Sequence, residues 1–308
     1  MMQLLCIGEA MAELRKGSDG FAVGFAGDTF NTAVYCRRLL PAAMKVGFLT
    51  RIGTDPLSSG FLALAEAENI DATSIRRDPS HNFGIYSVQT DASGERSFHY
   101  WRNDSAARKM FQADEDFGAL SQAGIVYLSA ITLAIIAPAA REALLSHLAG
   151  LRAKGIRIAF DSNYRPRLWQ DAATARDWIS RMWRMTDIAL PSADDERALF
   201  GDADDAAVLA RLRDAGCRAG ALKCGESGPR AIAEGVPTGH FPAATHVLDT
   251  TAAGDSFNGA FLAALILDRD EKTAMHWGHQ MASAVIGQPG AIVPNTPQLQ
   301  DSRHASQY

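Results

Sequence analysis

The sequence is poor in cysteine and lacks the cysteine and histidine patterns of metal sites. Its 308 residues include four scattered cysteines and no CxxC pair, the cysteines being Cys6, Cys36, Cys217 and Cys224. Such thiols are expected to be reduced and buried in a cytoplasmic protein, and a zinc site is not expected. The eight histidines form no HExxH motif, so the sequence predicts no set of metal ligands.

A basic excess is also missing. Lysine and arginine number 30 against 35 acidic residues, which gives a net charge of -5. This balance argues against nonspecific binding of nucleic acid or of a membrane surface, although local arginines can still bind an anion. The N-terminal apolar run has no basic segment before it and is interpreted as a strand. The uncharged stretch Phe117–Ala140 is interrupted by polar residues, so we expect no membrane helix.

Two nucleotide-binding motifs are absent. No GxxxxGK[ST] occurs, which excludes a P-loop, and no GxGxxG follows the first apolar run, which argues against a dehydrogenase. A nucleotide site, if there is one, must be built in another way.

Short apolar runs alternate with longer amphipathic segments. "LLCIGEA", "KVGFLTRIG", "AGIVYLSA", "IRIAFDSN", "DIALPS" and "AGALKCG" resemble strands, and "TFNTAVYCRRLL" resembles a helix. This alternation predicts one α/β domain over residues 1–308, with a mainly parallel central sheet flanked by helices. Ligands of such sheets bind at the carboxyl ends of the strands. Segments at about 9–25 and 82–102 resemble hairpins, and we expect them to form a small β-sheet lid.

The stretch "DTTAAGDSF" places small residues before an aspartate and a helix-like run. The small residues Ala252, Ala253 and Gly254 would let an anion approach the unpaired N–H groups of a helix N-terminus. A carboxylate at Asp255 suits phosphoryl transfer, in which it orients the acceptor hydroxyl and takes its proton. The alternative is that Asp255 only caps the helix.

Two stretches carry a resemblance to a known family. "AGDTFNTA" (Ala26–Ala33) and "DTTAAGDSFNGAFL" resemble the N-terminal and C-terminal signatures of the ribokinase/PfkB sugar kinases, and "GTDPLSSGFLALAEAENID" resembles a further family segment. The resemblance spans almost the whole chain. It implies a ribokinase-like fold, ATP as phosphoryl donor, Mg²⁺ bridging the ATP phosphates, and a small sugar substrate. The stretches "YWRNDSAA", "DSNYRPRLW" and "DTTAAGDSF" most resemble the branch that phosphorylates 2-keto-3-deoxygluconate at its terminal 6-hydroxyl.

The resemblance implies roles in catalysis. Asp255 would be the catalytic base, and the backbone N–H groups of Ala252, Ala253 and Gly254 would hold charge on the transferred group. The wider family usually has glycine at the position of Ala252, and alanine fits there if its φ angle is negative.

It also implies a substrate site. Gly27, Asp28 and Asn31 match the first signature, in which Asp and Asn can bind vicinal hydroxyls; the alternative for Asp28 is an N-cap. Tyr86, Tyr100 and Arg102 fall on the expected lid, where an aromatic pair could be packing alone, and Arg102 is expected to share the face of Tyr100. Arginine suits a carboxylate, which a sugar acid has and a neutral hexose lacks.

Other matched positions are implied to contact substrate, nucleotide or ions. They are Arg165 and Asp249 for the substrate (Asp249 alternatively near a monovalent cation such as K⁺), and Asn163, Lys223, Gly225 and Gly228 for the nucleotide. The segment Lys223–Gly228 could equally be a surface hairpin. Asp161 and Arg167 are expected to form a structural ion pair. Ser192 and Asp195 stand where many members have Asn and Glu, and Asp195 could bind hydrated magnesium.

Two alternatives remain at this point. Another sugar kinase of the family, such as a fructokinase, would not need the lid arginine. A catalytically inactive binding homologue would not need Asp255. The family's lid often pairs between subunits, so a homo-oligomer is expected.

Overall fold

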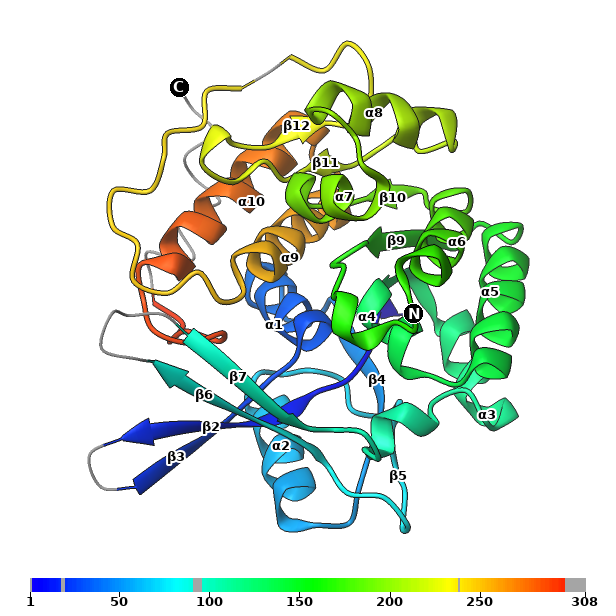
Figure 1. Cartoon of the computed structure of the whole chain (residues 1–308), viewed down its shortest axis with the longest axis vertical. Coiled ribbons are helices and arrows are strands. Elements are labelled where there is room, and N and C mark those ends of the chain that lie inside the picture. The colour runs from blue at the N-terminus through cyan, green and yellow to red at the C-terminus, as the bar shows by residue number, and fades with distance from the viewer. Residues whose placement is uncertain (1, 18–19, 91–95, 238, 297–308) are drawn as a thin grey trace.

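A six-stranded sheet forms the centre of the protein (Figure 1). The structure, a computed structural model, describes residues 2–17, 20–90, 96–237 and 239–296. The strand order is β10-β9-β8-β1-β4-β5, and every neighbouring pair is parallel. The strands are β1 (Met2–Ile7), β4 (Val46–Ile52), β5 (Ile75–Arg77), β8 (Ala123–Ser129), β9 (Arg157–Asp161) and β10 (Ile188–Ala189). The predicted mainly parallel sheet is confirmed.

Helices cover both faces of this sheet because successive side chains of a strand point to opposite faces. In β1, Leu5 and Ile7 belong to one buried cluster, and Leu4 and Cys6 belong to the other. The first cluster is closed by α4 (Ala130–Ile135), α5 (Pro138–Arg152), α6 (Ala172–Trp183), α7 (Ala193–Phe200) and α8 (Asp205–Asp214). The second is closed by α1 (Asp28–Leu39), α2 (Pro56–Ala67), α9 (Ala253–Ile266) and α10 (Glu271–Ile286). The short helix α3 (Asp114–Gly118) precedes β8.

The helices α1 and α9 pack very closely at Gly259. A Cβ atom added there would lie 2.7 Å from the carbonyl oxygen of Thr32 and 2.9 Å from the backbone nitrogen of Cys36. Only a residue without a side chain lets the two backbones approach so closely. The first turn of each helix is thereby brought to the same place.

A separate four-stranded sheet forms the expected lid, which Figure 1 shows projecting from the main body. Its strands, in the order β3-β2-β6-β7, are β2 (Met11–Gly17), β3 (Gly20–Ala26), β6 (Gly84–Thr90) and β7 (Arg96–Trp101). Both predicted hairpins are present; residues 18–19 and 91–95 of their turns lie outside the described ranges. The base of the lid is anchored by Phe25, whose ring lies 6.3 Å from that of Phe61 and 6.0 Å from that of Phe83.

One predicted strand is different in the structure. "AGALKCG" contributes the two-residue strand β11 (Ala221–Leu222), which pairs antiparallel with β12 (Arg230–Ala231) and not with the main sheet. Only isolated bridges join this segment to β10 and to Ser192. At the first bridge, a Cβ on Gly220 would lie 1.9 Å from the carbonyl oxygen of Ala189, so glycine is required there.

The four cysteines are free thiols, as expected. Burial raises the pKa of each, to about 12 for Cys217 and Cys224. Across the described ranges, no helix is long and apolar enough to cross a membrane.

Candidate active site

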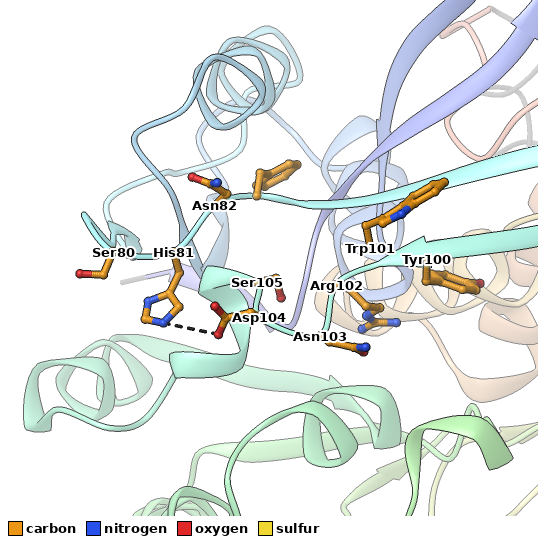
Figure 2. Close-up of a pocket in the computed structure, with 10 residues that line it drawn as sticks. Ser80, His81, Asn82, Tyr100, Trp101, Arg102, Asn103, Asp104 and Ser105 are labelled. Atoms are coloured by element: carbon orange, nitrogen blue, oxygen red, sulfur yellow. Dashed lines mark ion pairs between the residues drawn. The ribbon is translucent and has the colours of Figure 1, made fainter.

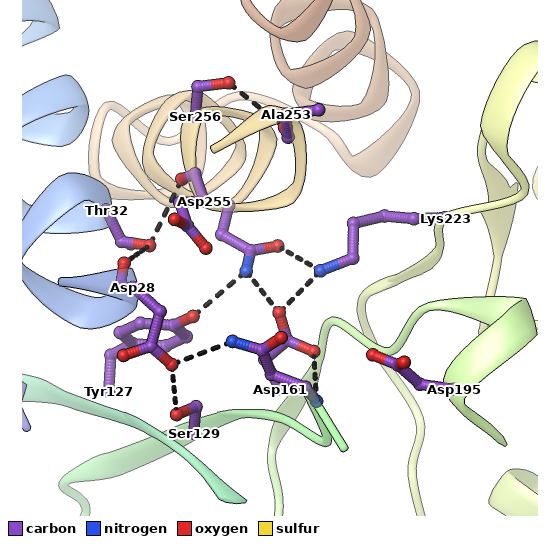
Figure 3. A network of polar contacts seen from close by, with 12 residues as sticks. Asp28, Thr32, Tyr127, Ser129, Asp161, Asp195, Lys223, Ala253, Asp255 and Ser256 are labelled. Carbon is purple, nitrogen blue, oxygen red and sulfur yellow. Dashed lines mark hydrogen bonds and ion pairs between the residues drawn. The ribbon is translucent and has the colours of Figure 1, made fainter. Parts of the chain in front are cut away.

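Four elements bring their polar ends together at one edge of the main sheet. The strands β8 and β9 end there at Ser129 and Asp161, and α1 and α9 begin there. Figure 3 shows side chains from all four elements pointing into one polar network, with Asp28, Asp161 and Asp255 in it. This is the edge at which parallel sheets bind ligands.

Asp28 is held in this network and does not cap its helix. The N-cap of α1 is Gly27, and Asp28 follows it as the first helical residue. The Oδ2 atom of Asp28 accepts hydrogen bonds from the Ser129 hydroxyl and, at 2.8 Å, from Nδ2 of Asn163. The capping alternative for Asp28 is therefore wrong. Gly27 is needed for a close approach, since a Cβ there would lie 2.2 Å from the carbonyl oxygen of Glu9.

Asp255 lies in the first turn of α9, and its carboxylate points away from that helix's own N–H groups. The N-cap is Ala252, which makes no side-chain cap bond. The Oδ2 atom of Asp255 accepts a 2.8 Å hydrogen bond from Nδ2 of Asn31, and Thr32 Oγ1 donates to the Asp255 carbonyl at 3.1 Å. The capping alternative for Asp255 is wrong as well, because its carboxylate is directed to α1.

The electrostatic environment of Asp255 favours its protonated form. Desolvation by burial raises the pKa of Asp255 from its ordinary value to about 7, and the like charges of Asp28 and Asp161 add to the rise. The hydrogen bond from Asn31 and the charge of Lys223 oppose it. A carboxylate tuned toward neutrality can both accept a proton and return it to solvent.

Ala252 adopts a left-handed conformation, with φ 60° and ψ 15°. The condition under which alanine would fit here without strain, a negative φ angle, is not met. For an L-residue this backbone conformation costs roughly 1–2 kcal/mol, and glycine would avoid that cost because it has no Cβ atom. The Ala252 side chain packs against the small cluster of Met11, Ala26, Tyr86 and Ala291, three of whose members come from the lid strands.

Lys223 follows β11 and reaches the same network. Its Nζ atom donates to Oδ2 of Asp161 at 2.6 Å and to Oδ1 of Asn258 at 3.0 Å. Nδ2 of Asn258 also donates to Oδ2 of Asp161, at 2.7 Å. Asp161 is thus paired with Lys223, and the expected ion pair of Asp161 with Arg167 is wrong: the lysine comes from a distant segment that the sequence order does not reveal.

Other predicted nucleotide residues are divided between two places. Asn163 is buried beside Asp28, next to the expected substrate residues. Gly225 and Gly228 have φ angles of 56° and 77°; Gly225 begins the short 3-10 helix η4 (Gly225–Ser227), and Gly228 follows it, between β11 and β12. This segment is a hairpin connection, and it also carries Lys223 into the network.

The lid brings its three predicted residues together. Tyr86 and Tyr100 are cross-strand partners whose stacked rings are 5.9 Å apart, and the Arg102 guanidinium lies 5.9 Å from the Tyr100 ring centre. Arg102 is only 7% exposed and forms an ion pair with Glu9. Its Nε atom is buried and has no hydrogen-bond partner within the described ranges. Such a donor suits a ligand oxygen, because buried polar groups are normally paired.

Sequence reasoning missed two buried glutamates beside these residues. Glu9 accepts from the Ser105 hydroxyl as well as pairing with Arg102, and Glu13 accepts from the Tyr86 hydroxyl. Both are less than 4% exposed. A signal was available, because two acids stand four positions apart in the otherwise apolar "IGEAMAEL".

Four further predicted residues make other contacts. Arg165 is half-exposed and pairs with Asp195 at 3.3 Å, and burial raises the pKa of that aspartate. Ser192 is the N-cap of α7 without a side-chain cap bond. Asp249 is buried and accepts from the backbone nitrogens of Thr251 and Gly290, at 2.8 Å and 2.7 Å. In the part of the chain that the structure describes, no group of three His, Cys, Asp or Glu side chains could hold a metal ion.

A hollow of about 390 Å³ lies at the base of the lid (Figure 2). Tyr100, Arg102 and the pair of His81 with Asp104 line it. Asp255 does not line it.

The chain matches a family model over residues 1–299, described as pfkB family carbohydrate kinase. It is 41% identical over 297 residues to the 2-dehydro-3-deoxygluconokinase of Dickeya dadantii (strain 3937), covering 94% of this chain and 96% of that protein. It is 38% identical over 300 residues to the enzyme of the same name from Escherichia coli (strain K12), covering 95% and 97%.

Solved structures share the fold. The 2-dehydro-3-deoxygluconokinase of Thermotoga maritima matches with a TM-score of 0.82 at 20% identity, covering 98% of both chains. A fructokinase of Vibrio cholerae O395, bound to fructose, ADP and a potassium ion, matches with a TM-score of 0.82 at 22% identity, covering 94% of both chains. These likenesses establish the ribokinase-like fold.

Proposed function

The chain belongs to the pfkB family of carbohydrate kinases, and from that premise we propose that it phosphorylates 2-keto-3-deoxygluconate with ATP. The product is 2-keto-3-deoxy-6-phosphogluconate, formed at the terminal hydroxyl. The relatives named 2-dehydro-3-deoxygluconokinase, at 38–41% identity over nearly the whole chain, support this substrate.

In the proposed reaction, one bond to phosphorus forms, another breaks, and one proton moves. The oxygen of the 6-hydroxyl forms a bond to the γ-phosphorus while the bond from that phosphorus to the β,γ-bridging oxygen breaks. The electron pair of the broken bond stays on ADP, and the hydroxyl proton passes to the Asp255 carboxylate. The backbone N–H group of Gly254 would face the phosphoryl charge at the start of α9, whereas that of Ala253 donates to the carbonyl oxygen of Thr250 at 3.2 Å.

One observation carries the kinase assignment: a carboxylate with a raised pKa lies in the first turn of a helix and faces Asn31 and Asp28 from the other signature. Asp28 and Asn31 would hold the sugar hydroxyls next to the base. Gly27 lets the start of α1 pack against the backbone of Glu9, and Asn163 fixes the Asp28 carboxylate.

Arg102 favours a sugar acid as the acceptor. Its guanidinium is buried at the lid base with an unused Nε donor, and Tyr86 and Tyr100 pack beside it. A carboxylate could take that donor while Glu9 holds the other side of the guanidinium. A fructokinase, the alternative, has no carboxylate to place there. Arg165 and Asp249 remain candidates for further substrate contacts.

ATP brings the magnesium that we expect. When bound, Mg²⁺ neutralises phosphate charge, and it is usually held by the phosphates and a few carboxylates or waters. The described residues offer no three-ligand set, so Asp195 would contact the ion only through water. Lys223 fits the phosphates themselves, and Gly225 and Gly228 allow a close backbone approach.

The expected homo-oligomer stays a prediction, with a second copy of the lid as the partner. Phe21, Val23 and Trp101 are between 52% and 65% exposed and lie on the lid face that also carries Phe25. Analytical ultracentrifugation of wild type and V23D tests it: a smaller species in the variant is expected, and identical masses would contradict it.

The proposed function is tested by ADP release. The purified protein is given ATP, magnesium and a panel of sugar acids and neutral sugars, and the product of the best acceptor is located by ³¹P NMR. Turnover that is fastest on 2-keto-3-deoxygluconate, with a 6-phosphate product, is expected. Faster turnover on fructose would replace the proposed substrate with the alternative.

A further inference from the structure

A buried cation is clamped at the start of α9. The Lys223 side chain is 10% exposed, and its partner Asp161 is 4% exposed. Asn258 completes a triangle: it accepts from Nζ of Lys223 and donates to Asp161, and its Nδ2 atom also donates to the Tyr127 hydroxyl at 3.0 Å. We call Lys223, Asp161 and Asn258 the lysine clamp (Figure 3 shows Lys223 pointing at Asp161).

The clamp leaves one donor of the lysine unused. An ammonium has three N–H groups, and within the described ranges two of them donate, to Asp161 and Asn258. A Cβ atom built on Gly254 would lie 3.5 Å from Nζ. The ammonium therefore lies beside the first turn of α9.

Asp161 is held too firmly to serve as a proton acceptor itself. Its Oδ2 atom accepts from Lys223 and Asn258, and its Oδ1 atom accepts from the backbone nitrogen of Asn163 at 3.0 Å. A carboxylate with these fixed donors is suited to aim the lysine, and Oδ1 of Asn258 is the second acceptor that holds it.

We infer that Lys223 binds the γ-phosphoryl group during transfer, and that Asp161 and Asn258 are positioning residues that aim its ammonium at that group. This rests on the proposed phosphoryl transfer, and it holds for any acceptor, because the γ-phosphoryl group is the same whichever sugar is used. An ammonium at this point offsets negative charge that spreads over the phosphoryl oxygens as the bridging bond breaks.

The clamp also acts on the base. Lys223 lowers the pKa of Asp255, whereas Asp161 and Asp28 raise it. The other titratable groups that interact with Asp255 are the hydroxyls of Tyr35 and Tyr127, both with a raised pKa, and Asn31 donates a hydrogen bond to it. Removing the lysine and removing the aspartate should therefore shift the base in opposite directions.

Three variants test the inference on the full-length protein: K223Q, D161N and the double variant. For K223Q we expect kcat to fall by roughly 10²–10³-fold, the usual loss for one charge-stabilising donor, and the acid limb of the pH profile to move to higher pH. For D161N we expect about a tenfold fall and a limb at lower pH. The double variant should have the kcat of K223Q, because Asp161 acts through the lysine.

A binding measurement does not depend on turnover. Calorimetry compares the affinities for ADP and for a non-hydrolysable ATP analogue, each with magnesium. K223Q and D161N should weaken the analogue at least tenfold more than ADP, because only the analogue has a third phosphate. K45Q is the control, since the Lys45 side chain is 66% exposed and pairs with Asp71; it should match wild type.

Three results would each overturn the inference. The first is an unchanged ratio of the affinities for the ATP analogue and for ADP, and the second is a double variant whose loss of kcat is the product of the two single losses. The third is that the acid limbs of the K223Q and D161N pH profiles do not shift in opposite directions. If K223Q does not fold, D161N alone decides, because this substitution keeps the side-chain volume. An affinity ratio and an acid limb that are both unchanged in D161N would then overturn the inference. The assays use whichever sugar the wild type turns over fastest, so a wrong substrate in the proposed function is seen separately.

Discussion

Asn31 and Asp255 lie 224 positions apart in the sequence, and Nδ2 of Asn31 donates a 2.8 Å hydrogen bond to Oδ2 of Asp255. This bond joins the two signature stretches into one site. It also holds a carboxylate whose pKa is raised by burial and by neighbouring acids. The chemical consequences of that environment are open to measurement.

The pH dependence of turnover should report the raised pKa of Asp255. The base works when deprotonated, so kcat/KM should fall below about pH 7, by tenfold per unit. N31A removes a hydrogen bond that lowers the pKa, and its acid limb should lie at higher pH. Coupled ADP-release assays from pH 5 to 9 measure both profiles. A wild-type limb near the ordinary aspartate value would contradict the environment described here.

D255N should fold and bind nucleotide but turn over roughly 10²–10⁴ times more slowly, because an amide cannot accept the hydroxyl proton. Steady-state kinetics and calorimetry with ADP measure the two properties. D194N is a matched control, since Asp194 is 91% exposed and pairs only with Arg197 on the surface. Turnover of D255N within tenfold of wild type would refute the role of the base.

The charge of Arg102 should matter for a sugar acid and not for a neutral sugar. Removing Arg102 alone strands the buried Glu9, which costs about 3–5 kcal/mol of stability, so the double variant E9Q/R102M is the better test. Its KM for the sugar acid should rise roughly 10- to 150-fold, from about 1.5–3 kcal/mol of lost binding. The KM for fructose, if it is a poor substrate, should stay the same. Equal effects on both acceptors would mean that Arg102 only supports the lid.

Because Ala252 has a left-handed backbone conformation, replacing it by glycine should stabilise the protein, and replacing it by a β-branched residue should destabilise it. A252G should raise the free energy of unfolding by about 1 kcal/mol, and A252V should lower it by about 1–3 kcal/mol. Urea denaturation measures both. A destabilised A252G would show that the packing of the methyl group on Met11 and Tyr86 outweighs the backbone cost.

The sequence predicts this fold well because strand and helix periods and the small-residue turns are local properties. The main sheet, the lid hairpins and the position of Asp255 follow from such patterns. The partners of buried charges do not: Lys223 meets Asp161 across 62 positions, and Arg102 meets Glu9 across the base of the lid. The φ angle of Ala252 could not be predicted from the sequence for a related reason, since the backbone conformation at the start of a helix depends on the residues that pack around it. Strand β11 was misplaced because its pairing depends on Gly220 meeting Ala189.

The close packing of α1 on α9 sets the order in which the site can form during synthesis. The ribosome produces Asn31 long before Asp255, and all six strands of the main sheet lie between the N-terminus and α9. Asp28 and Ser129 are therefore made before the proposed base, Asp255. Gly259 lets the later helix pack on the earlier one. A chain that has not yet reached α9 lacks Asp255, so the proposed phosphoryl transfer cannot begin before α9 has been made and packed on α1.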